Sequence, residues 1–144
     1  SEELAYRHVV SLFGGAATHT EENDTGGAIG LSYAYKLNHQ WAIGLKVEYA
    51  SSRLERDFVI LPGVAFEPVE RVEFALGFGL EQVSRDETDH GETHTVEESE
   101  ALLRLTFAYA FPLRSNVFLS PEFNADITKS QVTYVYGLVL SVGL

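Results

Sequence analysis

The sequence predicts an all-β fold: a closed, antiparallel, eight-stranded, up-and-down transmembrane β-barrel. Apolar residues alternate with small or polar residues at a period of two along most of the chain, and the apolar spacing of a long helix is nearly missing. The alternating segments are roughly 10 to 12 residues long, whereas the mean strand of a soluble protein has about 5 to 6. Strands of this length suit a bilayer, which a tilted strand of about 10 residues crosses.

Five segments alternate without interruption, with bulky apolar residues on one face and mostly Gly, Ala, Ser or a single charge on the other. Three further segments are less regular, and one of them contains Pro62, which marks an edge or a bulge because proline donates no ladder hydrogen bond. The regular segments are residues 27–37, 41–50, 72–81, 101–111 and 134–144, and the others are residues 7–18, 57–67 and 117–128.

The connections alternate in kind along the chain. Polar and often longer ones cover residues 19–25, 52–56, 85–98 and 128–131, and short ones cover residues 38–40, 68–70 and 112–116. Long loops at one end and tight turns at the other are typical of barrels that span an outer membrane.

The small-residue face decides which side is inside. A soluble lipocalin-like barrel would carry its bulky apolar residues inward and a solvated polar face outward. Here the second face is mostly glycine, alanine and serine, which the narrow interior of eight strands accommodates. The bulky face therefore points to lipid, with aromatic residues near strand ends as membrane-interface anchors. These predicted anchors are Trp41, Tyr49, Phe74, Phe111, Tyr134 and Tyr136.

The inward charges are isolated and of both signs, and buried charges require partners. We therefore predict an ion-pair network that plugs the lumen. The predicted members are Lys46, Glu48, Glu81, Arg104, Glu122 and Asp126.

Composition fits one domain over residues 1–144, with 45% apolar residues and a formal charge of −11. The acidic excess argues against a nucleic-acid partner, and the lack of cysteine excludes disulfides and thiolate metal sites. The sequence begins at Ser1, which fits a mature start after signal-peptide cleavage and equally an arbitrary boundary.

From about Arg7 to Leu144 the chain resembles the small eight-stranded outer-membrane β-barrel proteins of Gram-negative bacteria. The final segment, residues 134–144, is an alternating apolar strand such as these proteins typically end with, although its last residue is leucine and theirs is usually aromatic. Residues 120–126 are similar to uncharacterised members of the group. The resemblance implies an outer-membrane location, with periplasmic termini and extracellular long loops.

Histidines and carboxylates in the first and third long loops form a candidate divalent-cation site, because imidazole and carboxylate together suit transition ions such as Zn²⁺. The alternative is a solvated acidic loop that binds no ion. Apart from this possible cation, no cofactor is expected. The candidate ligands are His19, Glu22, Asp24, Asp89, His90 and His94.

Three functions remain open. The first is a structural and interaction role, in which acidic loops contact lipopolysaccharide, another cell, or a partner protein in a larger outer-membrane complex. The second is a small channel or ligand-carrying barrel. The third is a lipid-modifying enzyme, which the sequence disfavours because His8 and Ser11 fall on opposite strand faces and His39 lies in a turn. We expect a protein that is not an enzyme.

Overall fold

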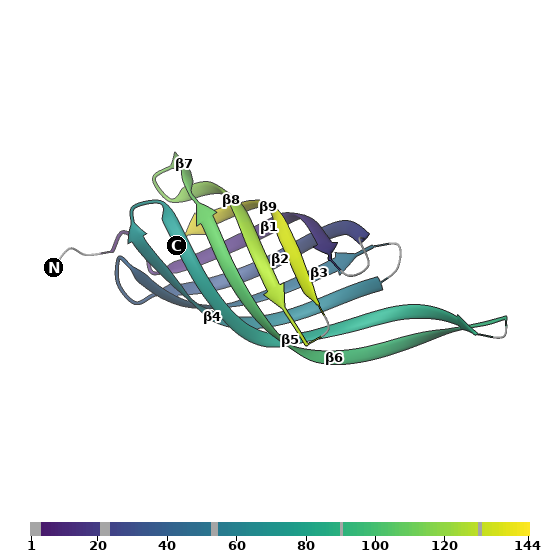
Figure 1. The fold of residues 1–144 in the computed structure, drawn as a ribbon. Helices are drawn as coiled ribbons and strands as arrows, with labels where there is room; N and C mark the ends of the chain where they lie inside the picture. The colour runs from purple at the N-terminus through teal and green to yellow at the C-terminus, as the bar shows by residue number, and fades with distance from the viewer. Residues whose placement is uncertain (1–3, 21–23, 53–54, 90, 130) are drawn as a thin grey trace.

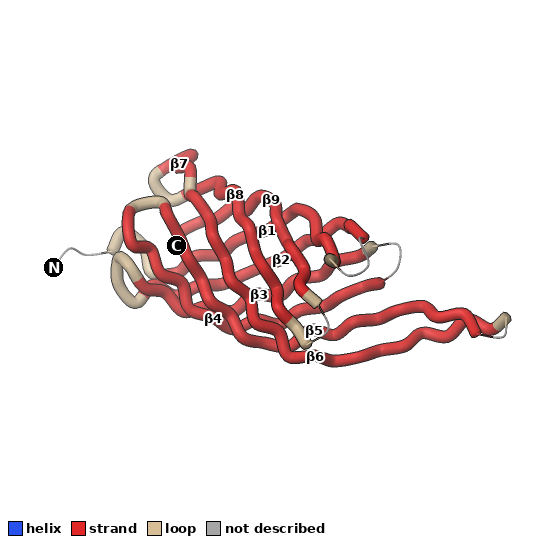
Figure 2. The backbone as a smooth tube through the Cα atoms, viewed as in Figure 1, coloured by secondary structure: helices blue, strands red, loops and turns tan. Residues whose placement is uncertain are grey.

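The computed structural model describes residues 4–20, 24–52, 55–89, 91–129 and 131–144, and nearly all of them lie in one β-sheet (Figure 1, Figure 2). Among these residues no helix has the length and apolar character needed to cross a bilayer. The strands are β1 (His8–His19), β2 (Asp24–Lys36), β3 (Trp41–Ser51), β4 (Glu55–Val69), β5 (Val72–Asp89), β6 (Glu92–Tyr109), β7 (Phe111–Arg114), β8 (Val117–Ile127) and β9 (Val132–Gly143).

The sheet closes on itself. Each strand pairs antiparallel with its neighbour, β9 returns to β1, and β6 pairs with β8 over Leu103–Ala108 and Ile127–Glu122. The ring is therefore β1-β2-β3-β4-β5-β6-β8-β9, which confirms the predicted eight-stranded barrel. Closure leaves few backbone groups of the barrel wall without a partner, as a lipid environment requires.

The short strand β7 is a difference from the prediction. The predicted segment 101–111 breaks at Ala110, and its end forms β7, which pairs with the start of β8 in the register that β6 keeps and becomes irregular after Pro112. Proline has no N–H to donate, so a regular ladder cannot continue through this position. The wall still counts eight strands because β7 extends β6.

The start of β1 and the C-terminal Leu144 lie at one end of the barrel, which we call the turn end (Figure 1). The His8 N–H donates to the Leu144 carbonyl oxygen at 3.3 Å, and the Leu144 N–H donates to the His8 carbonyl oxygen at 2.7 Å. The short connections between β2 and β3, β4 and β5, and β7 and β8 lie at this end. The connection between β6 and β7 lies there too, and the opposite end, which we call the hairpin end, carries the ends of β1, β3, β5 and β8.

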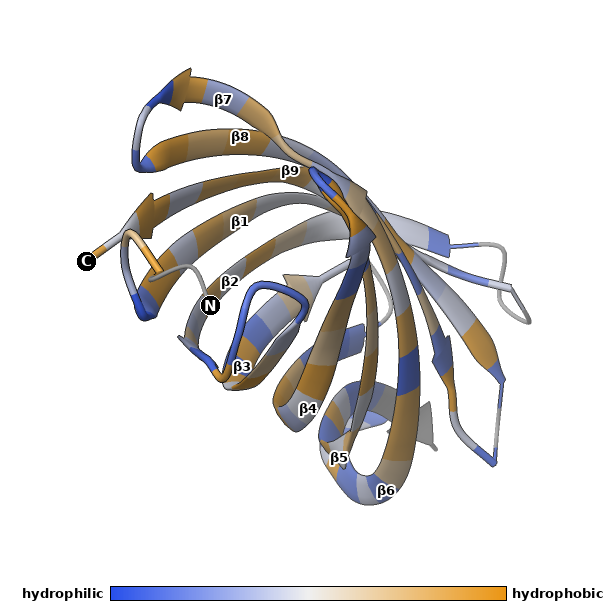
Figure 3. Cartoon of the chain, turned by 90° about the vertical axis from the view of Figure 1, so that its left-hand side faces the viewer, coloured by the Kyte–Doolittle hydropathy of each residue, from blue (hydrophilic) through white to orange (hydrophobic). Residues whose placement is uncertain are grey.

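The two faces of the barrel wall have the predicted sidedness. Along each strand in Figure 3, orange and pale or blue segments alternate. Outward-facing Leu31, Phe78 and Leu138 are 53%, 66% and 52% exposed, whereas inward-facing Glu48 and Arg104 are buried. A soluble protein would not leave so many large apolar side chains uncovered.

All six predicted interface aromatics face outward. The turn end carries Trp41, whose ring is tilted against that of Phe66 with ring centroids 4.5 Å apart. The hairpin end carries Tyr136, whose hydroxyl lies 3.0 Å from Thr18 Oγ1. Their positions near both ends of the strands fit two aromatic girdles. The six are Trp41, Tyr49, Phe74, Phe111, Tyr134 and Tyr136.

The predicted loop over residues 85–98 is wrong in kind, because this segment is a β-hairpin. β5 and β6 pair without a break from Val72–Tyr109 to Asp89–Glu92 and extend well past the other strand ends (Figure 1). Thr93, Thr95 and Val96 are β-branched and favour strand geometry, and their preference outweighs that of the acidic residues on either side of them.

Candidate functional site

Arg104 is the centre of the polar lumen. Its side chain is fully buried and forms two bidentate ion pairs. Nη1 and Nη2 donate to the Glu48 carboxylate at 2.9 and 2.8 Å, while Nε and Nη2 donate to the Asp126 carboxylate at 2.5 and 2.7 Å. Asp126 lies beside Arg104 on β8, whereas Glu48 reaches it across the lumen from β3. Two carboxylates on one guanidinium leave a formal charge of −1.

A second network lies nearer the turn end, on the preceding inward positions of β8. Lys46 Nζ lies 3.5 Å from Glu122 Oε2, which also accepts a hydrogen bond from the Asn124 side-chain amide at 3.1 Å. The Thr106 hydroxyl donates to Asn124 Oδ1 at 2.6 Å, and the same amide group also donates to the Val135 carbonyl oxygen. Five of the six predicted lumen charges thus belong to these two networks.

The sixth predicted lumen charge, Glu81, belongs to an acidic group at the hairpin end. Glu81 is buried, and it lies near enough to Asp57 for the two carboxylates to repel each other. Glu55 and Asp57 are adjacent inward positions of β4, and His19 faces them from the end of β1. His19 Nε2 lies 3.2 Å from Asp57 Oδ2 and 3.7 Å from Glu55 Oε1.

The structure describes the side chains of three of the six predicted metal ligands and places them on β1, β2 and β6. His19 is not a loop residue: it is the last residue of β1 and is only 2% exposed. Asp24 begins β2 beside it, while His94 is exposed on β6 and Asp89 ends β5. Within the described ranges, the only group of three metal-ligand side chains joins His19 to Glu55 and Asp57. Glu22 and His90 lie outside the described residues.

Glu55 and Asp57 were not recognised as site residues from the sequence. They were divided between an expected loop and the start of an expected strand, although a Glu-x-Asp spacing places both side chains on one face of a strand. The Glu-x-Asp spacing is the feature of the sequence that indicates a pair of carboxylates on one strand face. The level at which their face meets His19 depends on strand register, which the sequence pattern does not give.

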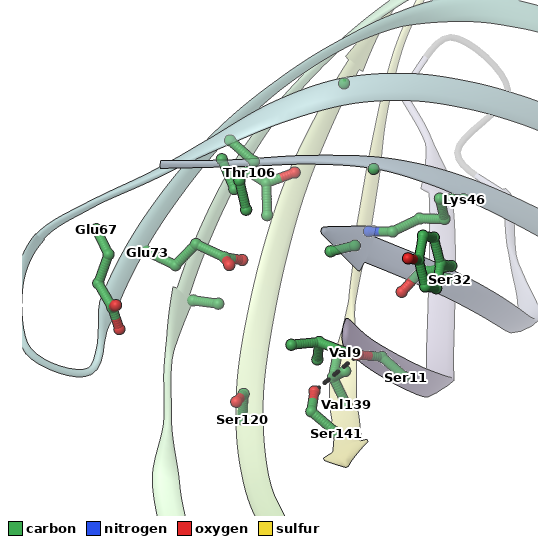
Figure 4. Close-up of a pocket in the computed structure, with 18 of the residues that line it drawn as sticks. Val9, Ser11, Ser32, Lys46, Glu67, Glu73, Thr106, Ser120, Val139 and Ser141 are labelled. Atoms are coloured by element: carbon green, nitrogen blue, oxygen red, sulfur yellow. Dashed lines mark hydrogen bonds between the residues drawn. The ribbon is translucent and has the colours of Figure 1, made fainter. Parts of the chain in front are cut away.

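The turn end of the lumen is hollow. A cavity of about 240 Å³ opens there (Figure 4), with Ser11 and Ser141 hydroxyls 2.8 Å apart on its wall. Lys46, Glu73 and Glu67 contribute charge to the lining. Pockets for small organic ligands typically measure about 300 to 1,000 Å³, so this volume is small for a carried ligand.

His8 and Ser11 do not lie close enough for the histidine to activate the serine hydroxyl as a nucleophile. His8 is exposed on the outer face with Nδ1 2.5 Å from the Tyr33 hydroxyl, whereas Ser11 faces the lumen and bonds to Ser141. A base-activated hydroxyl needs both groups within hydrogen-bond reach.

The closed ring of strands, its apolar outer face and its charged interior define a transmembrane β-barrel. No family model matches the sequence, and no curated protein matches it. Among solved structures, the fold is similar to that of a major outer membrane protein from Thermus thermophilus, with a TM-score of 0.71 and 14% identity over 98% of this chain and 100% of that one.

Two further structures show the same likeness. Ail, the attachment invasion locus protein of Yersinia pestis, gives a TM-score of 0.69 and 11% identity over 97% of this chain and 99% of that one. Neisserial surface protein A gives a TM-score of 0.68 and 11% identity over 100% of this chain and 100% of that one. This chain therefore has the fold of small outer-membrane β-barrel proteins of Gram-negative bacteria.

Proposed function

We propose that the chain is an integral outer-membrane protein of a Gram-negative bacterium that acts as a non-enzymatic contact protein. In this proposal the termini are periplasmic, and the β5–β6 hairpin is extracellular. The barrel is a rigid anchor, and the hairpin is the surface that meets a partner. The observation that carries the proposal is the length of this hairpin beyond the barrel, because an anchor alone does not need it.

The hairpin offers an unpaired strand edge. In the described part of the chain, β6 pairs with β8 only from Leu103 onward, so the stretch Glu92–Leu102 pairs with β5 alone. On the other side, pairing of β5 with β4 ends at Arg85. An open edge accepts an added strand through main-chain hydrogen bonds.

Charge defines the kind of partner. Residues 86–98 contain six acidic residues and no lysine or arginine, so like charge keeps copies of this chain apart and favours a basic strand. Ail has been solved with a heparin analogue, which is a polyanion. Charge repulsion disfavours such a ligand at this hairpin. We therefore propose a protein partner with a basic, extended segment.

The test is binding of a synthetic peptide of alternating lysine and valine to the purified barrel in nanodiscs. We expect saturable binding that falls at least roughly tenfold when residues 86–98 are replaced by an Asn-Gly turn, since both the edge and its charge are lost. Glu92→Gln combined with Glu97→Gln and Glu98→Gln should weaken binding while keeping the edge.

Oligolysine of equal charge is the matched control, because it binds by charge without a strand preference. Equal affinity for both peptides, or no loss on hairpin replacement, would refute strand addition. Calcium-dependent binding to lipopolysaccharide vesicles in place of the peptide would assign the hairpin to lipid instead.

The proposal includes a lumen that does not conduct. Thr106 and Glu122 line the turn-end cavity, and Arg104 with its two carboxylates lies at the next inward position toward the hairpin end, where a narrow eight-stranded barrel leaves little space beside side chains. The purified barrel in planar bilayers should therefore give no discrete conductance steps. Steps that persist in independent preparations would favour the small-channel alternative.

A further inference from the structure

We propose that His19, Glu55 and Asp57 form a binding site for one divalent first-row transition-metal ion inside the hairpin end of the barrel. The site differs from the predicted loop site and shares only His19 with it. It goes beyond the contact function, because it does not involve the β5–β6 hairpin tip.

The donor atoms have the spacing of metal ligands. One atom from each of the three side chains lies within 4.8 Å of the other two, and His19 Nε2 is 3.2 and 3.7 Å from the nearest oxygens of Asp57 and Glu55. Ligands about 2.1 Å from a tetrahedral ion lie roughly 3.4 Å from one another. Small movements of the side chains would therefore complete the coordination.

The burial of the Glu55 carboxylate is a second observation, separate from the donor spacing, that points to a bound cation. Its side chain is 1% exposed, and no N–H or hydroxyl group donates a hydrogen bond to either carboxylate oxygen, although the Asp57 carboxyl group lies close enough to share a proton with it. The nearest cationic nitrogens, His19 Nε2 and Arg85 Nε, are 3.7 and 3.6 Å away, beyond hydrogen-bonding distance. Asp57 Oδ1 is likewise buried without a partner. Buried carboxylates are normally hydrogen-bonded, paired or bound to metal.

The buried carboxylates around the three donor side chains also favour a bound cation. Four buried carboxylates gather at this end of the lumen, from Glu55, Asp57, Glu81 and Glu100, while Arg85, 3.6 Å from Glu55, is one cation beside them; repulsion acts on Asp57 from Glu81 and Glu55. An ion at the three donor atoms would neutralise part of this excess.

His19 is oriented to bind through Nε2. Its Nδ1 lies 3.1 Å from the Thr133 hydroxyl oxygen and 3.4 Å from the Gln131 side-chain nitrogen. In the tautomer with the proton on Nδ1, that proton is donated to Thr133 Oγ1 and the Nε2 lone pair points at the two carboxylates, whereas the contact with the Gln131 nitrogen fits the other tautomer, in which Nδ1 accepts. One imidazole with two carboxylates suits a transition ion better than Ca²⁺ or Mg²⁺, which prefer oxygen donors throughout.

An ion at this position would join strands on different sides of the lumen. β1 and β4 are separated in the wall by β2 and β3, so the coordination would tie the end of β1 to the beginning of β4 across the mouth of the barrel.

The test is calorimetric titration of Zn²⁺ into the full chain, purified in detergent and stripped with EDTA. We expect one saturable site. Affinity should fall at least roughly tenfold in His19→Gln and in Asp57→Asn. His94→Gln, which removes an exposed histidine from the hairpin, is the matched control and should bind as the unchanged protein does.

Two further measurements make the result decisive. Heat-modifiable migration of each variant in EDTA shows whether its barrel is folded, and Cu²⁺ electron paramagnetic resonance should show one imidazole nitrogen that disappears in His19→Gln. Heat no greater than dilution, or binding that survives His19→Gln and is lost in His94→Gln, would overturn the proposal.

Discussion

Replacing Arg104 with leucine should reduce the free energy of unfolding by roughly 3 to 5 kcal/mol, because the change leaves two buried carboxylates without a partner. Glu48 and Asp126 are 3% and 4% exposed, so water cannot solvate them in place of the guanidinium. The measurement is urea unfolding of the barrel in phospholipid bilayers, followed by the fluorescence of Trp41.

The control removes the stranded charges as well. A variant that combines Arg104→Leu with Glu48→Gln and Asp126→Asn should recover most of the lost stability, since a buried ion pair replaced as a whole costs little. If Arg104→Leu alone left stability unchanged, the description of Arg104 as the centre of the lumen would be wrong.

Replacing Leu138 with arginine should reduce the free energy of unfolding in a bilayer by roughly 2 to 4 kcal/mol, the cost of a cation on the lipid face near the midplane. Leu138 lies in the middle of β9, is 52% exposed and faces outward. Urea unfolding in bilayers measures this change too.

Leu113→Arg is the matched control, because Leu113 is 57% exposed but lies on β7 at the turn end. Its replacement should cost only about 0 to 1 kcal/mol, as expected near the interface. In a soluble barrel, both exposed leucines would tolerate arginine equally. Equal effects would therefore contradict the membrane assignment of the outer face.

The lumen and the outer face contribute to stability differently. Outside, lipid replaces water around the apolar side chains, so the penalty depends on the depth of an introduced charge. Inside, the barrel holds ionised groups that are stabilised only by one another, so the penalty depends on which partner is lost. The two predictions above test these two environments separately.

Local pattern was enough to predict the sidedness of the wall. A period of two assigns every residue of a strand to one of two faces, and the contrast between Phe78 or Leu138 outside and Gly79 or Gly137 on the other face fixes which face meets lipid. The same pattern identified Arg104, Glu48 and Asp126 as inward residues. It failed on the hairpin, where acidic residues obscured a paired strand that Thr93, Thr95 and Val96 favour.

The amino-acid sequence by itself determined the fold class, the number of wall strands and the face on which each strand residue lies, because these depend on neighbours along one strand. Only the tertiary structure decided that Arg104 meets Glu48, 56 positions away, and that His19 meets Glu55 and Asp57. The physical reason is that the stagger of strands around a closed barrel sets the height of each inward side chain. That stagger results from all the pairings together.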